Sequence, residues 1–203
     1  MKRVSLLVMG LLLGAGAAPA FAQGAPGLAL TAELRQGEID SKLLPHPGTS
    51  AQLGRAVALV NASAADVTAV LQDYARYQTF LPNFQASRVL SQRGASALVY
   101  LQVSILHGAA TIWVEVKLQP READGGKRVI EAKMLKGNVS RFEASWEVTP
   151  VDAQHTLVAF QIFVDPDMPV PTSLVDHENQ KNARKALAAL RDLMDQRKGR
   201  IKA

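Results

Sequence analysis

The segment RFEASWEVT, residues 141–149, alternates between apolar and polar side chains. Phe142, Ala144, Trp146 and Val148 would point to one side of an extended chain, and the residues between them to the other. This period of two is typical of a β-strand that buries one face and exposes the other. The segment therefore predicts a sheet with one dry face, which the rest of the chain has to cover.

The same period continues on both sides of this segment, from residue 88 to residue 164. Apolar side chains recur at every second position in 99–105, 112–118 and, more loosely, 158–164. Turn-forming residues separate these runs at 93–94, 107–108, 124–126, 136–138 and 150–154. Short strands joined by short turns predict an antiparallel meander. An earlier strand is expected over 53–61, after a proline-containing loop at 45–50, and the first strand could begin within 34–39.

Helical spacing marks two other parts of the chain. Ser63 is a suitable N-cap, and the apolar residues of 67–74 follow it at helical intervals. Tyr74, Tyr77 and Phe80 then share one side of a further helical turn, which Pro82 ends. A long helix is predicted from about 173 to about 197, after three prolines at 166–171. Its apolar stripe can cover the dry face of the sheet, and towards its start the stripe becomes polar at Asp176 and 179–180.

The first 22 residues resemble a secretory signal peptide. Lys2 and Arg3 precede an apolar run at 4–13, and small residues lead to Ala22. We therefore expect cleavage near Ala22 and a periplasmic or secreted protein, with a flexible leader over 23–33, one ligand-binding domain over 34–197 and a basic tail over 198–203. A buried N-terminal helix is the alternative for the apolar run.

Composition narrows the class of function. The 203 residues are 48% hydrophobic and 20% charged, as in an ordinary globular domain. The net charge of +5 falls to about +3 without Lys2 and Arg3, which gives little reason to expect nucleic acid as a partner. The absence of cysteine excludes disulfides, thiolate metal sites and cysteine nucleophiles.

The order strand, short helices, antiparallel sheet and long C-terminal helix predicts an α+β helix-grip fold, in which a curved sheet wraps around the last helix. Residues 53–197 resemble the START-like, or SRPBCC, superfamily, in particular its coenzyme Q-binding and polyketide cyclase-like branch. The resemblance rests on VNASAADV at 60–67, on Asp73, Tyr74, Tyr77, Phe80 and Pro82, on WEV at 146–148, and on Pro169 and Pro171. It implies a cavity for a hydrophobic ligand, and leaves open whether the chain carries lipids or catalyses a reaction.

A strongly bent sheet closed by one helix also leaves apolar side chains that cannot all meet at close packing. The residues predicted to line such a hollow come from the sheet and the last helix: Val103, Ile112, Val114, Phe142, Trp146, Phe160, Ile162, Asn179, Ala183, Ala186 and Leu187. A filled core explains the same apolar residues without any ligand. Asn179 and Asp176 are candidate contacts for a polar head group, although exposure at the start of the helix also explains them, and we prefer that explanation for Asp176.

Motifs that would carry chemistry are not found. The sequence contains no Gly-x-Ser-x-Gly elbow, zinc-binding His-Glu-x-x-His motif or phosphate-binding glycine loop. A metal site built from His177, Asp165 and Asp167 is conceivable, but turn and helix polarity explain these residues equally well. We therefore predict no catalytic residue, cofactor or metal.

Three classes of function remain, and we favour the first. In the first, an exported carrier binds a lipid or other hydrophobic small molecule. The second is a cyclase or aromatase that uses the same cavity, with Tyr100, Arg141 or Asn179 steering protons. The third is an interaction module with a filled core. A transient membrane-surface contact stays open, because the basic tail could attract anionic lipid, although it equally suits the negative end of the helix dipole.

Overall fold

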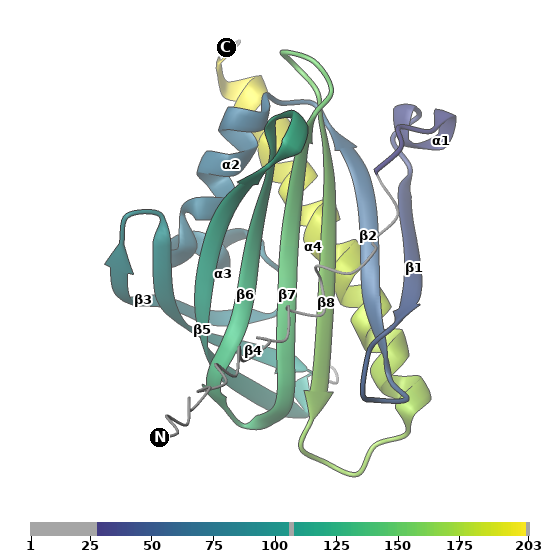
Figure 1. The fold of residues 1–203 in the computed structure, drawn as a ribbon, viewed down its shortest axis with the longest axis vertical. Coiled ribbons are helices and arrows are strands. Elements are labelled where there is room, and N and C mark those ends of the chain that lie inside the picture. Colours follow the sequence, from purple (N-terminus) through teal and green to yellow (C-terminus); the bar gives the residue numbers. More distant parts are fainter. Residues whose placement is uncertain (1–27, 106–107, 202–203) are drawn as a thin grey trace, which may run out of the picture.

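The computed structural model describes residues 28–105 and 108–201. One eight-stranded antiparallel sheet wraps around a long C-terminal helix (Figure 1). In chain order the elements are α1 (Ala32–Arg35), β1 (Ile39–Pro45), β2 (Gln52–Val60), α2 (Ala64–Gln72), a 3-10 turn (Tyr74–Arg76), α3 (Tyr77–Phe80), β3 (Phe84–Arg93), β4 (Ser96–Ile105), β5 (Ala110–Ala123), a second 3-10 turn (Asp124–Gly126), β6 (Lys127–Gly137), β7 (Val139–Pro150), β8 (Thr156–Pro166) and α4 (Thr172–Ile201). The predicted helix-grip architecture is confirmed.

The sheet has the strand order β1-β2-β8-β7-β6-β5-β4-β3. The five consecutive hairpin pairings from β3 to β8 form the predicted meander, and β2 then joins its edge by pairing with β8. Register shifts interrupt the ladders of β3 with β4, β5 with β6, and β7 with β8. Such bulges bend a strand and increase its twist, which helps the sheet to close around a helix.

Helix α2 begins where the sequence predicts. The Ser63 side chain caps the helix by accepting a hydrogen bond from the Asp66 amide at 3.1 Å. The rings of Tyr74, Tyr77 and Phe80 pack edge to face in the following turn, with Tyr74 and Tyr77 almost fully buried. This turn and α3 therefore act as a second cover for the sheet, next to α4.

Helix α4 lies along the inner face of the sheet and packs mainly on β2 and β8 (Figure 1). Its backbone passes so close to Gly54 of β2 that a Cβ there would overlap the carbonyl of Asn179. Ala183, Leu187 and Leu190 are fully buried on the helix face that presses on the sheet. A glycine on the strand and a small side chain on the helix thus fix how closely the two elements approach.

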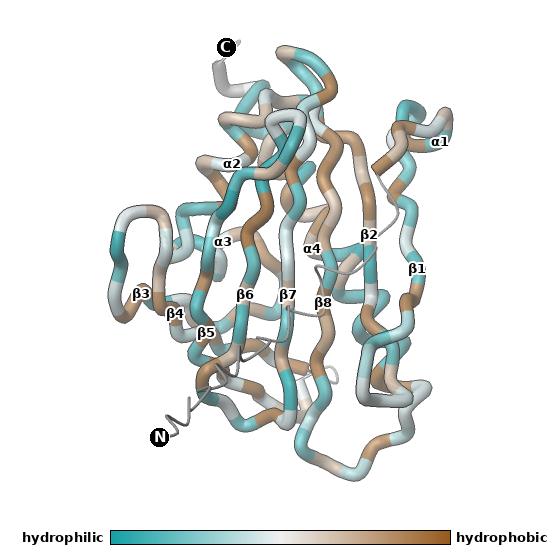
Figure 2. The backbone as a smooth tube through the Cα atoms, in the orientation of Figure 1, coloured by the Kyte–Doolittle hydropathy of each residue, from teal (hydrophilic) through white to brown (hydrophobic). Residues whose placement is uncertain are grey.

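The core lies between the inner sheet face, α4 and the α2–α3 segment. Figure 2 shows apolar stretches along β2 and β8, the strands on which α4 mainly packs. Both the predicted dry face of β7 and that of β8 belong to this cluster. The face of the sheet that is turned to the core is therefore the one predicted from the alternation of apolar and polar residues.

The N-terminal part of the chain differs from the sequence prediction. Residues 32–35 form the short helix α1, which was not predicted, and β1 begins at Ile39, at the end of the window 34–39 in which the first strand could begin. Leu28 and Leu30 pack against Leu34 and Val57 on the outer face of the sheet, so packing begins within the segment predicted as a leader over 23–33. Helix α4 likewise continues to Ile201, into the predicted tail at 198–203. The predicted signal peptide, residues 1–22, lies outside the described residues.

Candidate ligand-binding cavity

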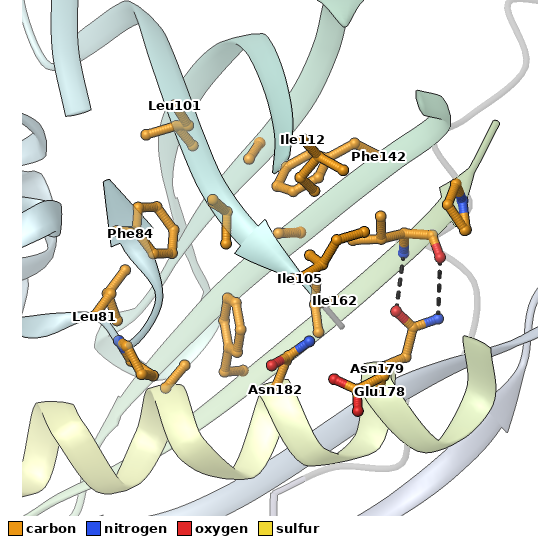
Figure 3. A pocket seen from close by; sticks show the side chains of 18 of the residues that line it. Leu81, Phe84, Leu101, Ile105, Ile112, Phe142, Ile162, Glu178, Asn179 and Asn182 are labelled. Atoms are coloured by element: carbon orange, nitrogen blue, oxygen red, sulfur yellow. Dashed lines mark hydrogen bonds between the residues drawn. The ribbon is translucent and has the colours of Figure 1, made fainter. Parts of the chain in front are cut away.

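A cavity of about 120 Å³ lies between α4 and the inner face of the sheet (Figure 3). Its wall is formed by strands β4 to β8, by Tyr77 of α3 and residues 81–84 after it, by Val170 in the loop before α4, and by the first half of α4. The wall is apolar apart from a few side chains, of which Glu178, Asn179 and Asn182 come from α4. The sheet and the helix therefore do not fill the space between them.

Eight of the eleven residues predicted to line a hollow do line this cavity: Val103, Ile112, Phe142, Trp146, Phe160, Ile162, Asn179 and Ala186. Val114, Ala183 and Leu187 do not. Their exposed fractions are 1%, 0% and 0%, and they belong to the filled part of the core. Ala183 and Leu187 lie on the α4 face that packs on the sheet, whereas Ala186 lies on the face turned to the cavity. Contact between any of these residues and a ligand remains a prediction.

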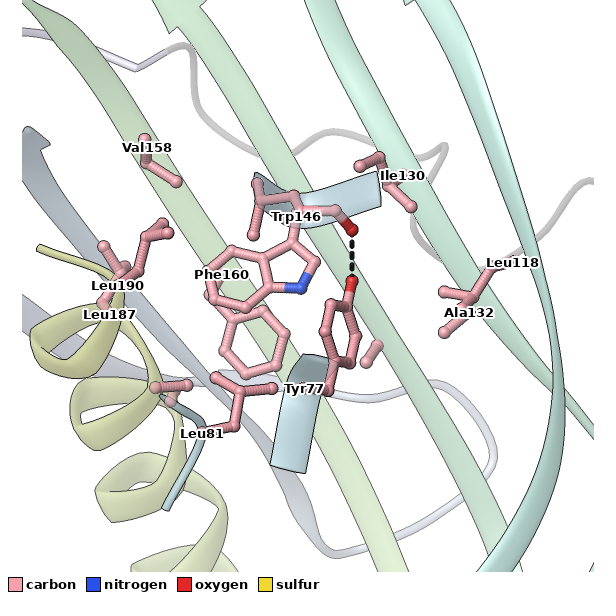
Figure 4. Packing of buried hydrophobic residues seen from close by; sticks show 14 of the residues in the cluster. Tyr77, Leu81, Leu118, Ile130, Ala132, Trp146, Val158, Phe160, Leu187 and Leu190 are labelled. Atoms are coloured by element: carbon pink, nitrogen blue, oxygen red, sulfur yellow. Dashed lines mark hydrogen bonds between the residues drawn. The ribbon is translucent and has the colours of Figure 1, made fainter. Parts of the chain in front are cut away.

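Two stacked aromatic rings form one wall of the cavity. Trp146 and Phe160 are cross-strand partners on β7 and β8, and their ring centroids are 4.1 Å apart (Figure 4). Tyr77 lies beside them, and its hydroxyl donates a 2.6 Å hydrogen bond to the Leu71 carbonyl. Burial raises the pKa of this phenol well above its ordinary value, so the hydroxyl stays protonated. This region offers a ligand flat apolar surface and no free polar group from Tyr77.

The size of the cavity limits what it holds in this conformation. One water molecule requires about 10–15 Å³ by the same measure, so the cavity has room for several. Pockets for drug-sized ligands usually measure about 300–1,000 Å³. Several wall residues are partly exposed and mark an opening, among them Pro166 and Val170 before α4 and Leu174 on its first turn. A larger guest would require these segments to move apart.

Asn179 is buried, but the sheet backbone satisfies its side chain. Its amide nitrogen donates to the Gln52 carbonyl at 3.0 Å. Its oxygen accepts from the Val164 amide at 3.1 Å, and its nitrogen also lies 3.5 Å from the Val164 carbonyl (Figure 3). Asp176 accepts from the Gln52 amide at 2.7 Å. The expectation of an exposed Asp176 at a frayed helix start is therefore wrong. Both residues fasten α4 to β2, and Asn179 has little hydrogen-bonding capacity left for a head group.

Glu178 and Asn182 are the polar wall residues that the sequence reasoning missed. A signal for them was present, because stepping back from Ala186 in intervals of four gives Asn182, Glu178 and Leu174. All four line the cavity. The polar residues predicted above, Gln180 and Asn179, belong to a neighbouring line along α4, which faces the sheet.

Tyr100 and Arg141, considered above as proton-steering residues, lie on the outer face of the sheet. The Tyr100 ring stacks on Trp113, which also points outwards. Arg141 donates to the Pro47 carbonyl at 3.2 Å and lies 3.3 Å from the ring nitrogen Nδ1 of His46. The His46 ring in turn stacks on Phe163. Neither Tyr100 nor Arg141 lines the cavity. Arg141 thus holds the loop between β1 and β2 against the sheet.

Two further features of the described residues concern metals and membranes. No three His, Asp or Glu side chains in 28–105 and 108–201 come together as a metal site, so His177, Asp165 and Asp167 do not form the cluster considered above. Within the same residues, no helix has both the length and the hydropathy needed to span a membrane.

Comparison with known proteins agrees with this architecture. The family described as polyketide cyclase / dehydrase and lipid transport matches residues 60–191, which is more than half of the chain. The chain belongs to this family. No curated protein is similar enough in sequence to be matched. The predicted resemblance to the START-like superfamily is confirmed.

Solved structures extend the family assignment to the fold. A STAR-related lipid transfer protein from Xanthomonas axonopodis superimposes with a TM-score of 0.70 at 21% identity, covering 82% of this chain and 97% of its own. A START superfamily protein from Mycobacterium smegmatis gives 0.61 at 19% identity, with 71% and 97% covered. The Zhui aromatase/cyclase from Streptomyces gives 0.54 at 14% identity, with 79% and 96% covered. At these identities the likeness establishes the shared fold of the family.

Proposed function

We propose that this family member is an exported protein that binds a lipid or another apolar small molecule in the cavity between α4 and the sheet, and carries it without catalysis. The observation that carries the proposal is a cavity with an almost wholly apolar wall. Binding would be driven by removing apolar ligand surface from water, which contributes about 25 cal/mol per Å². Movement of the 166–171 loop or of the start of α4 would admit the guest.

Two observations favour a carrier over the alternatives. The cavity itself argues against an interaction module with a filled core. A cyclase would need polar side chains such as Tyr100, Arg141 or Asn179 in the cavity. Tyr100 and Arg141 face away from it, and the Asn179 side chain is hydrogen-bonded to backbone groups. The signal-like pattern of residues 1–22 supports export.

A fluorescence titration tests the proposal. N-phenyl-1-naphthylamine is uncharged and brightens in apolar surroundings, and we expect one molecule to bind per chain. Ala186→Trp should abolish this site by filling the cavity, whereas Leu135→Trp adds the same ring at a position that is 57% exposed and outside the wall. Equal binding by both variants, with circular dichroism confirming that both fold, would contradict the proposal.

A further inference from the structure

The α4 face turned to the cavity is apolar at both ends and polar in the middle. Leu174, Glu178, Asn182 and Ala186 follow one another at intervals of four and all line the cavity. On a helix such residues lie one above another, about 5–6 Å apart. A guest lying along α4 would therefore meet apolar contacts on both sides of a short polar section.

The polar section, Glu178 and Asn182, has hydrogen-bonding capacity that contacts within the described part of the chain do not fill. Glu178 Oε1 accepts from Lys181 Nζ at 2.7 Å, and Lys181 itself does not line the cavity. Asn182 makes no side-chain hydrogen bond to any described residue, and Figure 3 places its amide at the cavity next to Ile162. By contrast, the Asn179 amide and the Tyr77 hydroxyl already bond to backbone groups. Along α4, the described part of the wall thus offers one unengaged amide beside a carboxylate that accepts from Lys181.

These groups favour one class of polar end on the guest. An amide both donates and accepts hydrogen bonds, whereas an ionised carboxylate only accepts. A hydroxyl or an amine can donate to the Asn182 or Glu178 oxygen. A carboxylate guest could accept from the Asn182 amide but cannot donate to the Glu178 oxygens. It would also bring a second negative charge next to Glu178, and the salt bridge from Lys181 at 2.7 Å reduces this repulsion without removing it.

We propose that the guest of this cavity is an amphiphile whose polar end donates hydrogen bonds to Asn182 and Glu178, and that ionised fatty acids are selected against. The inference rests on the proposed function, because it requires that the cavity binds a guest. It adds the chemical class of the polar end and the two residues that recognise it.

Displacement of N-phenyl-1-naphthylamine by 1-octanol, octylamine and octanoate at pH 8 tests this inference. Because octanoate is also better hydrated than octanol, the decisive readout is how each affinity changes in the variants. Asn182→Leu should weaken octanol binding about five- to tenfold, as expected for one lost hydrogen bond. Glu178→Gln should strengthen octanoate binding several-fold, and Asp192→Asn, the same charge change at an exposed position of α4, should leave it unchanged.

The outcomes separate this inference from the proposed function. If the dye binds to the wild-type chain but the octanol and octanoate affinities are the same in both cavity variants, the polar end lies elsewhere and the inference is overturned. If the dye does not bind to the wild-type chain at all, the proposed function itself fails. Dye binding to the wild-type chain, together with the shifts given above, supports both; the dye affinity of each variant is measured separately, so that displacement is converted into the affinity for octanol or octanoate.

Discussion

Replacing Ala186 by leucine should stabilise the protein, because this side chain faces empty space. Ala186 is 6% exposed and lines the cavity. Leucine adds three carbon atoms, and each buried methylene contributes about 0.8 kcal/mol. Fixing the longer side chain costs about 0.5–1 kcal/mol in conformational entropy. The free energy of unfolding should therefore rise by about 1.5 kcal/mol, and dye binding should weaken because the added atoms occupy part of the cavity.

Ala183→Leu is the matched control, one turn earlier on α4. Ala183 is fully buried and packs on the sheet, outside the cavity wall. Overpacking at such a site usually costs about 1–3 kcal/mol, so this variant should be destabilised. Urea unfolding of the ligand-free variants measures both changes. Equal destabilisation by the two substitutions would mean that the space beside Ala186 is as full as that beside Ala183, and that no cavity lies next to Ala186.

Three other predictions concern the frame around the cavity. Gly54→Ala should lower the free energy of unfolding by about 3 kcal/mol or more in urea titrations. The reason is that the new methyl group overlaps the Asn179 carbonyl and strains the hydrogen bonds of that side chain. A loss of less than about 0.5 kcal/mol would disprove the close approach of α4 to β2. Burial raises the pKa of Tyr74 to about 12. The contribution of this group to the free energy of unfolding should therefore be complete below pH 10, the ordinary pKa of a phenol, and be lost as the pH rises from 10 to 12. Tyr74→Phe should make the fall in stability over this range about 2–3 kcal/mol smaller, and parallel pH profiles of wild type and variant would contradict this. Arg141→Gln should cost about 1 kcal/mol through its lost bond to the Pro47 carbonyl and leave dye binding unchanged, whereas weakened dye binding would place Arg141 in ligand recognition.

Much of the fold could be predicted because its signals are local. The period of two along β7, the Ser63 cap of α2 and the prolines before α4 each act over a few residues. Residues 32–35 were harder, because four residues carry too little pattern to separate a helical turn from the start of a strand. Strand β6 could be predicted only from the turns on either side of it, because its buried residues alternate less regularly than those of β7.

The cavity was predicted less completely, for a physical reason. Alternation identifies the residues of the inner face, but Val114 and Ile112 lie on the same face of β5 and only Ile112 reaches the cavity. Which side chains meet closely depends on how near α4 approaches, and that is set by Gly54 and Asn179, two residues 125 positions apart. The sequence contains both residues but does not reveal their contact.

Native mass spectrometry shows directly whether a guest occupies the cavity. The chain would be purified without detergent from its own cells, measured intact, and then extracted with organic solvent to identify any released molecule. We expect a species heavier than the chain by the mass of one apolar guest, which disappears in Ala186→Trp and persists in Leu135→Trp. A wild-type chain that carries no guest and also takes up none from a total lipid extract would contradict the proposed function.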